Sequence, residues 1–168
     1  MPSLIKLTPA GAELVEDRFV TVLDEDAIPQ GADVIVSLTR LKADGEALLN
    51  SGVSVGVQIE PAEAVEDLAG FLPSLAVVAV AFPKFRDGRA YTSATLLRER
   101  LGFSGEVRAV GDVLREQAGF MLRCGFDAFV PADGSSAADW AKAAHRHRHV
   151  YQTAADGRVP AYAEPGRA

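Results

Sequence analysis

The sequence contains a single cysteine, Cys124, among its 168 residues. One thiol excludes a disulfide within the chain and any metal site built from several thiolates. Long apolar runs are also missing, because no unbroken stretch approaches the roughly 18 residues that a membrane-spanning helix needs. The first residues lack a basic segment followed by an apolar one, so we expect no secretory signal peptide, no membrane association and a cytoplasmic globular protein.

Positive charge is scarce as well. The chain has 17 Lys and Arg residues against 23 Asp and Glu, which gives a formal net charge of −6. Nucleic-acid binding generally depends on a basic face, so this balance argues against a nucleic-acid partner. Glycine motifs for dinucleotides and phosphates and the H-E-x-x-H zinc motif are absent from the sequence. We therefore predict no cofactor and no metal.

The apolar content is sufficient for one folded domain. Hydrophobic residues make up 48% of the chain, and a chain of this length buries roughly 70% of the surface that its unfolded form exposes. We predict a single domain over residues 1–151. Residues 152–168, which are relatively rich in proline and glycine, are predicted to form an exposed C-terminal tail.

From residue 34 onward, short apolar runs alternate with segments of helical periodicity. The strands are almost entirely apolar, so both of their faces are expected to be covered. Five strand–helix units in series predict an α/β fold with a mainly parallel sheet of about five strands. The predicted strands are 34–38, 53–59, 75–82, 107–110 and 128–130, and the predicted helices are 41–51, 61–72, 91–101, 113–124 and 136–149.

Two architectures are compatible with this pattern. We favour an open sheet with alternating helices, and a partial (β/α) barrel is the alternative, since a full barrel needs eight units. The first thirty residues predict a short N-terminal β segment of one or two strands, with a break at Pro9–Ala10–Gly11.

Local signals mark several helix ends. Pro61 and Pro73 bound the predicted helix between them. Ser136 and Asp139 have the spacing of a capping box at the start of the last helix. Three glycines that precede an apolar residue are typical of left-handed helix C-caps: Gly52, Gly102 and Gly125.

The loop after the third apolar run is unusual for an acidic protein. It places Lys84, Arg86 and Arg89 within six residues, just before a predicted helix. Ligands of parallel α/β sheets bind beyond the carboxyl ends of the strands, and guanidinium groups beside a helix N-terminus hold oxyanions. A solvated basic loop without a ligand and a contact for a protein partner are the other interpretations.

Asp112 follows the fourth apolar run and would lie beside this loop if the two strands are neighbours. Its carboxylate could orient Arg86 or Arg89, or cap the next helix. We predict an anion-binding site with Lys84, Arg86, Arg89, Asp112 and Tyr91, and secondary candidates Arg40, Glu60, Arg115 and Gln117.

Two other features have both a structural and a functional interpretation. Cys124 ends a predicted helix, where a lone cysteine is most often a small buried hydrophobe, whereas a redox role needs an exposed and electropositive setting. Arg123 supplies charge for the second interpretation. His145 and His149 have the spacing of one helix face and could pair on a metal, or they belong to a basic helix end.

Three separated motifs resemble a bacterial protein family of unknown function. They are FPKFRDGRAYTSA at 82–94 followed by LLR at 96–98, GDVLREQ at 111–117 and RCGFD at 123–127, within a resemblance over roughly residues 30–153. Members of that family are commonly described as probable oxidoreductases involved in sulfite reduction, largely from gene neighbourhoods shared with assimilatory sulfite reductase. The resemblance implies a role in sulfur assimilation and cysteine biosynthesis, and it assigns no catalytic residue.

Two functions from different classes follow. The first is an accessory protein of assimilatory sulfite reduction that acts with sulfite reductase and has no turnover of its own. The second is a small oxidoreductase, or another enzyme, that acts on a sulfur oxyanion held by the basic loop. The missing cofactor motifs favour the first function, and the charges at the strand ends favour the second.

Overall fold

The computed structural model describes residues 3–8, 11–164 and 166, and within them eight strands form one sheet. The order across the sheet is β2-β1-β8-β7-β6-β5-β4-β3. Neighbours from β3 to β8 are parallel, and β1 runs antiparallel to both β2 and β8. The strands are β1 (Ser3–Thr8), β2 (Gly11–Glu16), β3 (Phe19–Thr21), β4 (Asp33–Ser37), β5 (Val55–Ile59), β6 (Val77–Phe82), β7 (Glu106–Gly111) and β8 (Ala128–Phe129).

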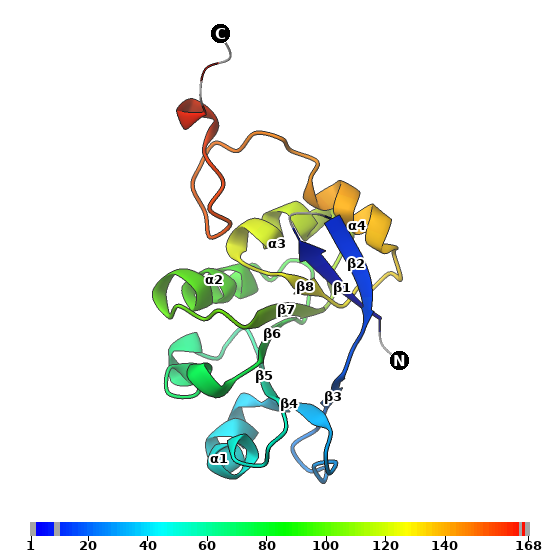
Figure 1. Cartoon of the computed structure of the whole chain (residues 1–168), viewed down its shortest axis with the longest axis vertical. Helices are drawn as coiled ribbons and strands as arrows, with labels where there is room; N and C mark the ends of the chain where they lie inside the picture. The colour runs from blue at the N-terminus through cyan, green and yellow to red at the C-terminus, as the bar shows by residue number, and fades with distance from the viewer. Residues whose placement is uncertain (1–2, 9–10, 165, 167–168) are drawn as a thin grey trace.

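The helices contribute to one core on a single face of this sheet, as Figure 1 illustrates. The opposite face carries a smaller apolar cluster that includes Phe19, Ile35 and Val77. The α-helices are α1 (Leu38–Leu49), α2 (Arg89–Thr95), α3 (Ala118–Cys124) and α4 (Ala137–Ala144). A π-helical turn, η3 (Leu96–Arg100), continues α2, and the 3-10 turns are η1 (Val65–Leu68), η2 (Leu72–Ser74), η4 (Arg115–Gln117) and η5 (Ala161–Ala163).

The sheet is curled into a half-barrel. β2 and β3 lie at opposite edges of the sheet, yet only Asp17 and Arg18 connect them. This connection spans at most about 11 Å, because consecutive Cα atoms are ~3.8 Å apart. The edges of a flat eight-stranded sheet would be separated by about 34 Å, at ~4.8 Å per strand. The two edges therefore approach each other at this end, where the blue β2 leads into β3 in Figure 1.

The structure confirms a single α/β domain and corrects the predicted architecture. We favoured an open sheet of about five strands, whereas the sheet is mixed, has eight strands in the described residues and is curled. The alternative of a partial barrel fits. The parallel strands follow one another in chain order, as in a barrel, whereas an open doubly wound sheet reverses its order at a switch point.

The extra strands come from the N-terminal thirty residues. The predicted β segment there is a hairpin of β1 and β2 followed by β3. The predicted break at Pro9–Ala10–Gly11 lies partly outside the described residues, since only Gly11 of the three is described. Leu14 of β2 is 61% exposed, so this edge strand has too little buried surface to give a clear apolar pattern.

One predicted helix is wrong and other local predictions are confirmed. Within residues 61–72 the helical residues are Val65–Leu68 of η1 and Leu72 at the start of η2, and both are 3-10 turns. Gly70, a residue that disfavours helix, lies between them. Ser136 and Asp139 form the reciprocal capping box of α4. Gly125 is the left-handed C-cap of α3, with a φ angle of 103°. Gly52 (81°) and Gly102 (65°) also have positive φ angles, but they follow the C-cap residues, which are Asn50 for α1 and Leu101 for η3.

The segment beyond residue 151 extends past α3 and away from the sheet in Figure 1. Arg123 of α3 contacts this segment, since its guanidinium donates to the Gln152 carbonyl and lies 3.5 Å from Asp156 Oδ2. The helices of the described residues are all too short or too polar to cross a membrane.

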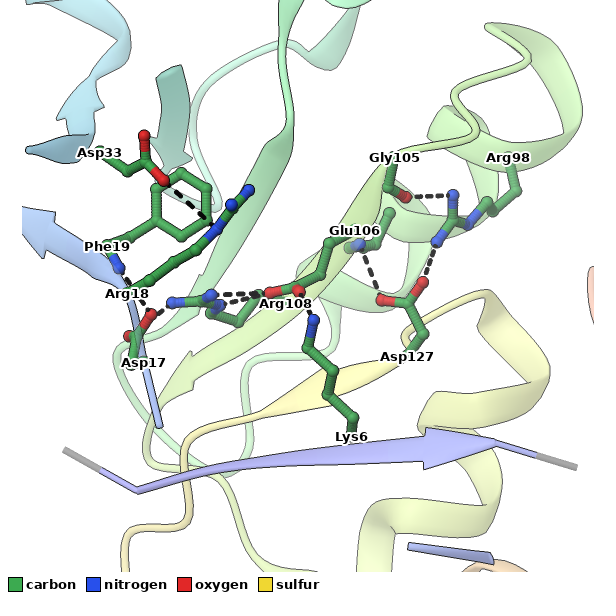
Figure 2. A network of polar contacts seen from close by, with 11 residues as sticks. Lys6, Asp17, Arg18, Phe19, Asp33, Arg98, Gly105, Glu106, Arg108 and Asp127 are labelled. Atoms are coloured by element: carbon green, nitrogen blue, oxygen red, sulfur yellow. Dashed lines mark hydrogen bonds and ion pairs between the residues drawn. The ribbon is translucent and has the colours of Figure 1, made fainter. Parts of the chain in front are cut away.

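The concave face of the half-barrel holds a buried ion cluster (Figure 2). Arg108 of β7 is 2% exposed, and its guanidinium lies 2.7 Å from both Asp17 Oδ2 and Glu106 Oε1. Lys6 Nζ of β1 completes the cluster at 2.7 Å from Glu106 Oε2. The cluster thus joins β1 and the β2–β3 connection to the middle of the sheet. It lies at the amino ends of the parallel strands, where barrel residues serve stability more often than chemistry.

Candidate functional site

β6 and β7 end together at the carboxyl edge of the sheet, as the sequence predicted. Phe82 is opposite Gly111 in the register of the two strands. Gly111 has φ +96°, and the next N–H, of Asp112, donates to the Phe82 carbonyl at 2.7 Å. This tight turn places Asp112 beside the loop of residues 83–88 that connects β6 to α2.

Asp112 binds the backbone of this loop. Its Oδ2 accepts a hydrogen bond from the Phe85 N–H at 2.8 Å. The sequence offered two other roles, the orientation of a guanidinium and a helix cap. In the described residues Asp112 forms no ion pair, and Leu114 occupies the N-cap position of η4. The carboxylate therefore fixes the loop and leaves the guanidinium groups of the loop to other partners.

The cations of the loop fall into two groups. Arg89 donates from Nε and Nη2 to the carboxylate of Asp87, at 3.0 and 2.7 Å, and this pairing holds the pKa of Asp87 below its usual value. Lys84 and Arg86 are exposed and form no ion pair with any described residue. Two of the three predicted cations are thus free to meet a ligand or a partner.

Two further predicted residues lie next to the loop: Tyr91 packs against the end of β6, and Gln117 contacts the loop backbone. The Tyr91 ring packs edge-on against Phe82 at 5.2 Å between centroids, and burial raises the pKa of Tyr91 to about 12. Gln117 Nε2 donates to the Phe85 carbonyl at 3.4 Å, and the buried Oε1 of Gln117 has no hydrogen-bond partner among the described residues. Tyr91 is therefore a neutral, partly buried support, whereas the sequence analysis gave it a place among the anion ligands.

The structure brings five predicted residues to one place: Lys84, Arg86, Tyr91, Asp112 and Gln117. Arg89 is adjacent but paired. The remaining candidates have other partners: Arg40 donates to the Leu23 carbonyl at 2.6 Å, Glu60 accepts from Gln58 at 3.1 Å, and Arg115 lies 3.9 Å from Asp139.

Phe85 is the central residue of this loop and is not among the residues predicted from the sequence. Its N–H and its carbonyl are both hydrogen-bonded, and its side chain is 41% exposed. An aromatic residue between two cations, Lys84 and Arg86, is the signal in the sequence that could have identified it.

The structure does not place His145 and His149 on one helix face, which is one of the two interpretations of these residues. α4 ends at Ala144, so His145 is its C-cap and His149 lies beyond the helix. His149 Nδ1 instead lies 2.8 Å from Glu164 Oε2. In the part of the chain that the structure describes, no group of three His, Cys, Asp or Glu side chains is placed to hold a metal ion.

Cys124 is a partly buried thiol at the end of α3. Burial raises its pKa, against smaller lowering effects of Thr95 and Arg123. A nucleophilic or redox-active cysteine needs the opposite shift, because the thiolate is the reactive form. The environment of Cys124 thus resembles that of a packed side chain.

We expect native Cys124 to react with a disulfide reagent such as Ellman's reagent at least about tenfold more slowly than a free thiol at pH 8, because few molecules carry the thiolate. The release of thionitrobenzoate measures the rate, and the same protein in denaturant is the control, in which one thiol should react rapidly. Complete reaction of the native protein at the denatured rate would contradict this environment.

Comparison with known proteins places the loop within a shared region. The model of a family described as bacterial protein of unknown function (DUF934) matches residues 56–162, which is more than half of the chain. The match includes the loop of residues 83–88, Asp112 and Gln117, and it continues into the segment beyond residue 151. No curated protein matches the chain.

Proposed function

The chain belongs to the DUF934 family of bacterial proteins, and we propose that it is an accessory protein of assimilatory sulfite reduction that acts with sulfite reductase. In this proposal it works in the cytoplasm, in the pathway to cysteine, and carries out no turnover alone. The proposed pathway is supported by the three sequence motifs. They resemble a family whose members are described as acting in sulfite reduction. The contact surface that we assign is the loop of residues 83–88.

The supporting observation is that hydrogen bonds hold the backbone of this loop while its residues 83–86 are exposed. Both backbone groups of Phe85 are bound, by Asp112 and Gln117, and the Lys84 carbonyl accepts from the Asp87 N–H at 2.9 Å. Residues 83–86 are exposed. A loop that is already ordered loses little conformational entropy when a partner binds, so it is well suited to docking.

The side chains of the loop indicate the chemistry of the partner surface. Phe85 offers an apolar anchor, and Lys84 and Arg86 flank it without a carboxylate partner among the described residues. Aromatic and Arg side chains are enriched in protein interfaces, and complementary charge accelerates association. The surface of sulfite reductase that receives the loop should therefore be acidic around an apolar pocket.

Deletion of the gene in its own bacterium tests the pathway. We expect a cysteine requirement that sulfide relieves and sulfite does not, because the block then lies at the reduction of sulfite. The wild-type gene should restore growth, and a Lys84→Glu/Arg86→Glu variant should not. Lys142→Glu/Arg148→Glu is the matched control, since both of its side chains are exposed and lie outside the loop. Growth of the deletion strain without cysteine would contradict the proposal.

Binding to purified sulfite reductase tests the surface. The Lys84→Glu/Arg86→Glu variant should bind at least about tenfold more weakly than wild type, and wild-type binding should weaken as salt is raised. The Lys142→Glu/Arg148→Glu control should bind as wild type does. Equal affinity of the loop variant and the control would mean that the loop is not the docking surface.

A second function is favoured by one observation, the two unpaired cations at a strand-end loop. In this alternative Lys84 and Arg86 hold a sulfur oxyanion for a small oxidoreductase or another enzyme. Calorimetry with sulfite, sulfate and phosphate distinguishes the two functions, because the enzyme should bind sulfite below about 1 mM and lose it in Arg86→Ala. Sulfite reduction by the isolated protein with a suitable electron donor would also favour the alternative.

A further inference from the structure

A second cationic site shares no residue with the loop of residues 83–88. It is a cavity of about 300 Å³ between α3, the end of α4 and the C-terminal segment. Its charged and aromatic lining consists of Phe120, Arg123, Arg146, His147 and Arg158, together with Glu116. This volume is at the lower end of the range for small-molecule sites, so it suits a compact ligand.

Backbone carbonyls orient two of the three guanidinium groups. Arg158 Nη2 donates to the carbonyls of His147 and Arg148, at 3.1 and 2.5 Å. Arg123 donates to the Gln152 carbonyl and is 18% exposed. A guanidinium has five N–H donors, so these contacts fix each group and leave other donors available.

The lining carries an excess of positive charge. Arg146 forms no ion pair with a described residue, and Asp156 offsets only Arg123, at 3.5 Å. Among the described residues, Glu116 is the one carboxylate in the lining. Three guanidinium groups around a small cavity repel one another, and a bound anion would remove that repulsion while gaining charge-assisted hydrogen bonds.

The distribution of charge along the chain also favours an anionic ligand. Residues 1–83 contain 4 Lys and Arg against 13 Asp and Glu, whereas residues 84–158 contain 12 against 9. The protein is acidic as a whole, with a net charge of −6. The cavity is thus a positive concavity in the basic half of an acidic protein, a setting that concentrates small anions locally.

The cavity also has an apolar side. Phe120 is 59% exposed, and its ring is held edge-on by Tyr91 at 4.8 Å between centroids. Val150, Ala143 and Ala144 line the same cavity. A ligand that contains an apolar or aromatic group beside its anionic group would therefore contact both kinds of surface.

We propose that this cavity binds a small organic ester of a tetrahedral oxyanion, with Arg123, Arg146 and Arg158 around the oxyanion and Phe120 against the organic group. The family match extends to residue 162, so it includes the segment that carries Arg158. The site is independent of the docking function of the loop, because the two share no residue.

Calorimetry at low salt with phenyl phosphate, phenyl sulfate, inorganic phosphate and inorganic sulfate tests the site. Phenyl phosphate should bind most tightly, with a Kd below about 1 mM, because it combines two negative charges with a ring. Phenyl sulfate distinguishes a sulfate ester from a phosphate ester as the ligand. It should bind more weakly than phenyl phosphate, because it has a single negative charge. Inorganic phosphate should bind at least about fivefold more weakly than its phenyl ester, since Phe120 has nothing to contact.

Variants assign the binding to the cavity. Arg146→Ala should weaken phenyl phosphate binding at least about tenfold. Arg146 is exposed, and its side chain forms no hydrogen bond or ion pair with a described residue. Phe120→Ala should bring phenyl phosphate close to inorganic phosphate in affinity. Lys142→Ala/Arg148→Ala and Lys84→Glu/Arg86→Glu should each bind it within about twofold of wild type, since their side chains lie outside the cavity.

Three results would overturn the inference. The first is the absence of any binding of the four probes below about 10 mM. The second is equal affinity of Arg146→Ala and wild type. The third is loss of binding in Lys84→Glu/Arg86→Glu alone, which would assign the oxyanion to the loop. None of these results bears on docking to sulfite reductase, which is measured separately.

Discussion

Replacing Arg108 with methionine should lower the free energy of unfolding by about 3–5 kcal/mol, the usual consequence of removing one partner of a buried ion pair. The variant leaves the carboxylates of Asp17 and Glu106 without the guanidinium that lies 2.7 Å from each. Lys6 still reaches Glu106, but in the described residues Asp17 keeps no cation. Chemical denaturation measures the loss, and the melting temperature should fall by about 10 °C.

A second substitution separates lost charge from lost packing. In the Arg108→Met background, Asp17→Asn removes the carboxylate that keeps no cation among the described residues, so the deficit relative to wild type should shrink. An equal deficit in the single and double variants would mean that the side-chain volume of Arg108 matters and its charge does not.

Arg18→Ala is the neighbouring control for this prediction. Arg18 lies 3.3 Å from Asp33 at a side-chain exposure of 66%, and exposed ion pairs of this kind contribute about 0–1 kcal/mol. The control should therefore change stability little, although it is adjacent to Asp17 in the short connection between β2 and β3. A large loss in Arg18→Ala would indicate that the connection itself, and not the buried ion pair, holds the edges together.

The sequence reveals the parallel strands because burial on both faces leaves an unbroken apolar run. All six residues of β6 are buried, and its run was predicted within residues 75–82. The N-terminal hairpin leaves a weaker pattern, since one edge strand is partly exposed. The curl of the sheet could not be predicted, because it follows from a connection of two residues whose reach matters only once the strand order is known.

Arg108 illustrates a different limit. It stands within the apolar run 107–110, where a cation has to find a carboxylate, and that much is visible in the sequence. The partner Asp17 is 91 residues away along the chain. The contact between Arg108 and Asp17 forms because the sheet curls. The partner of Arg108 therefore could not be predicted without the curl of the sheet.

The neighbourhood of Asp112 and the basic loop was predictable, and the individual bonds were not. Adjacent parallel strands place Phe82 opposite Gly111, which brings Asp112 to the loop. The acceptor role of Asp112 toward the Phe85 backbone has no sequence signature, because every residue except proline offers an N–H. Arg89 pairs with Asp87, two residues away, since a local pair closes no long loop.

Gly111→Ala should destabilise the protein by about 3 kcal/mol or more, because two separate strains coincide at this residue. The φ angle of +96° is one that L side chains rarely adopt. A Cβ atom would also lie 2.5 Å from the Phe82 carbonyl oxygen, which is backbone and cannot rotate away. Relief requires the end of β7 to move from β6, which would stretch the hydrogen bond from the Asp112 N–H to the Phe82 carbonyl.

Gly52→Ala is the matched control, since Gly52 has a similar φ angle of +81° and a Cβ there would meet no atom within 4 Å. It should therefore show the conformational cost alone, about 1 kcal/mol. Thermal unfolding of the two variants gives the difference, which measures the close approach of β6 and β7. The same movement would draw Asp112 away from Phe85, so under the proposed docking function Gly111→Ala should also bind sulfite reductase more weakly at a temperature where it is fully folded. Equal stability of the two variants would show that the end of β7 can move away from β6 at little cost in free energy. The loop would then be less rigid than the proposed docking function requires.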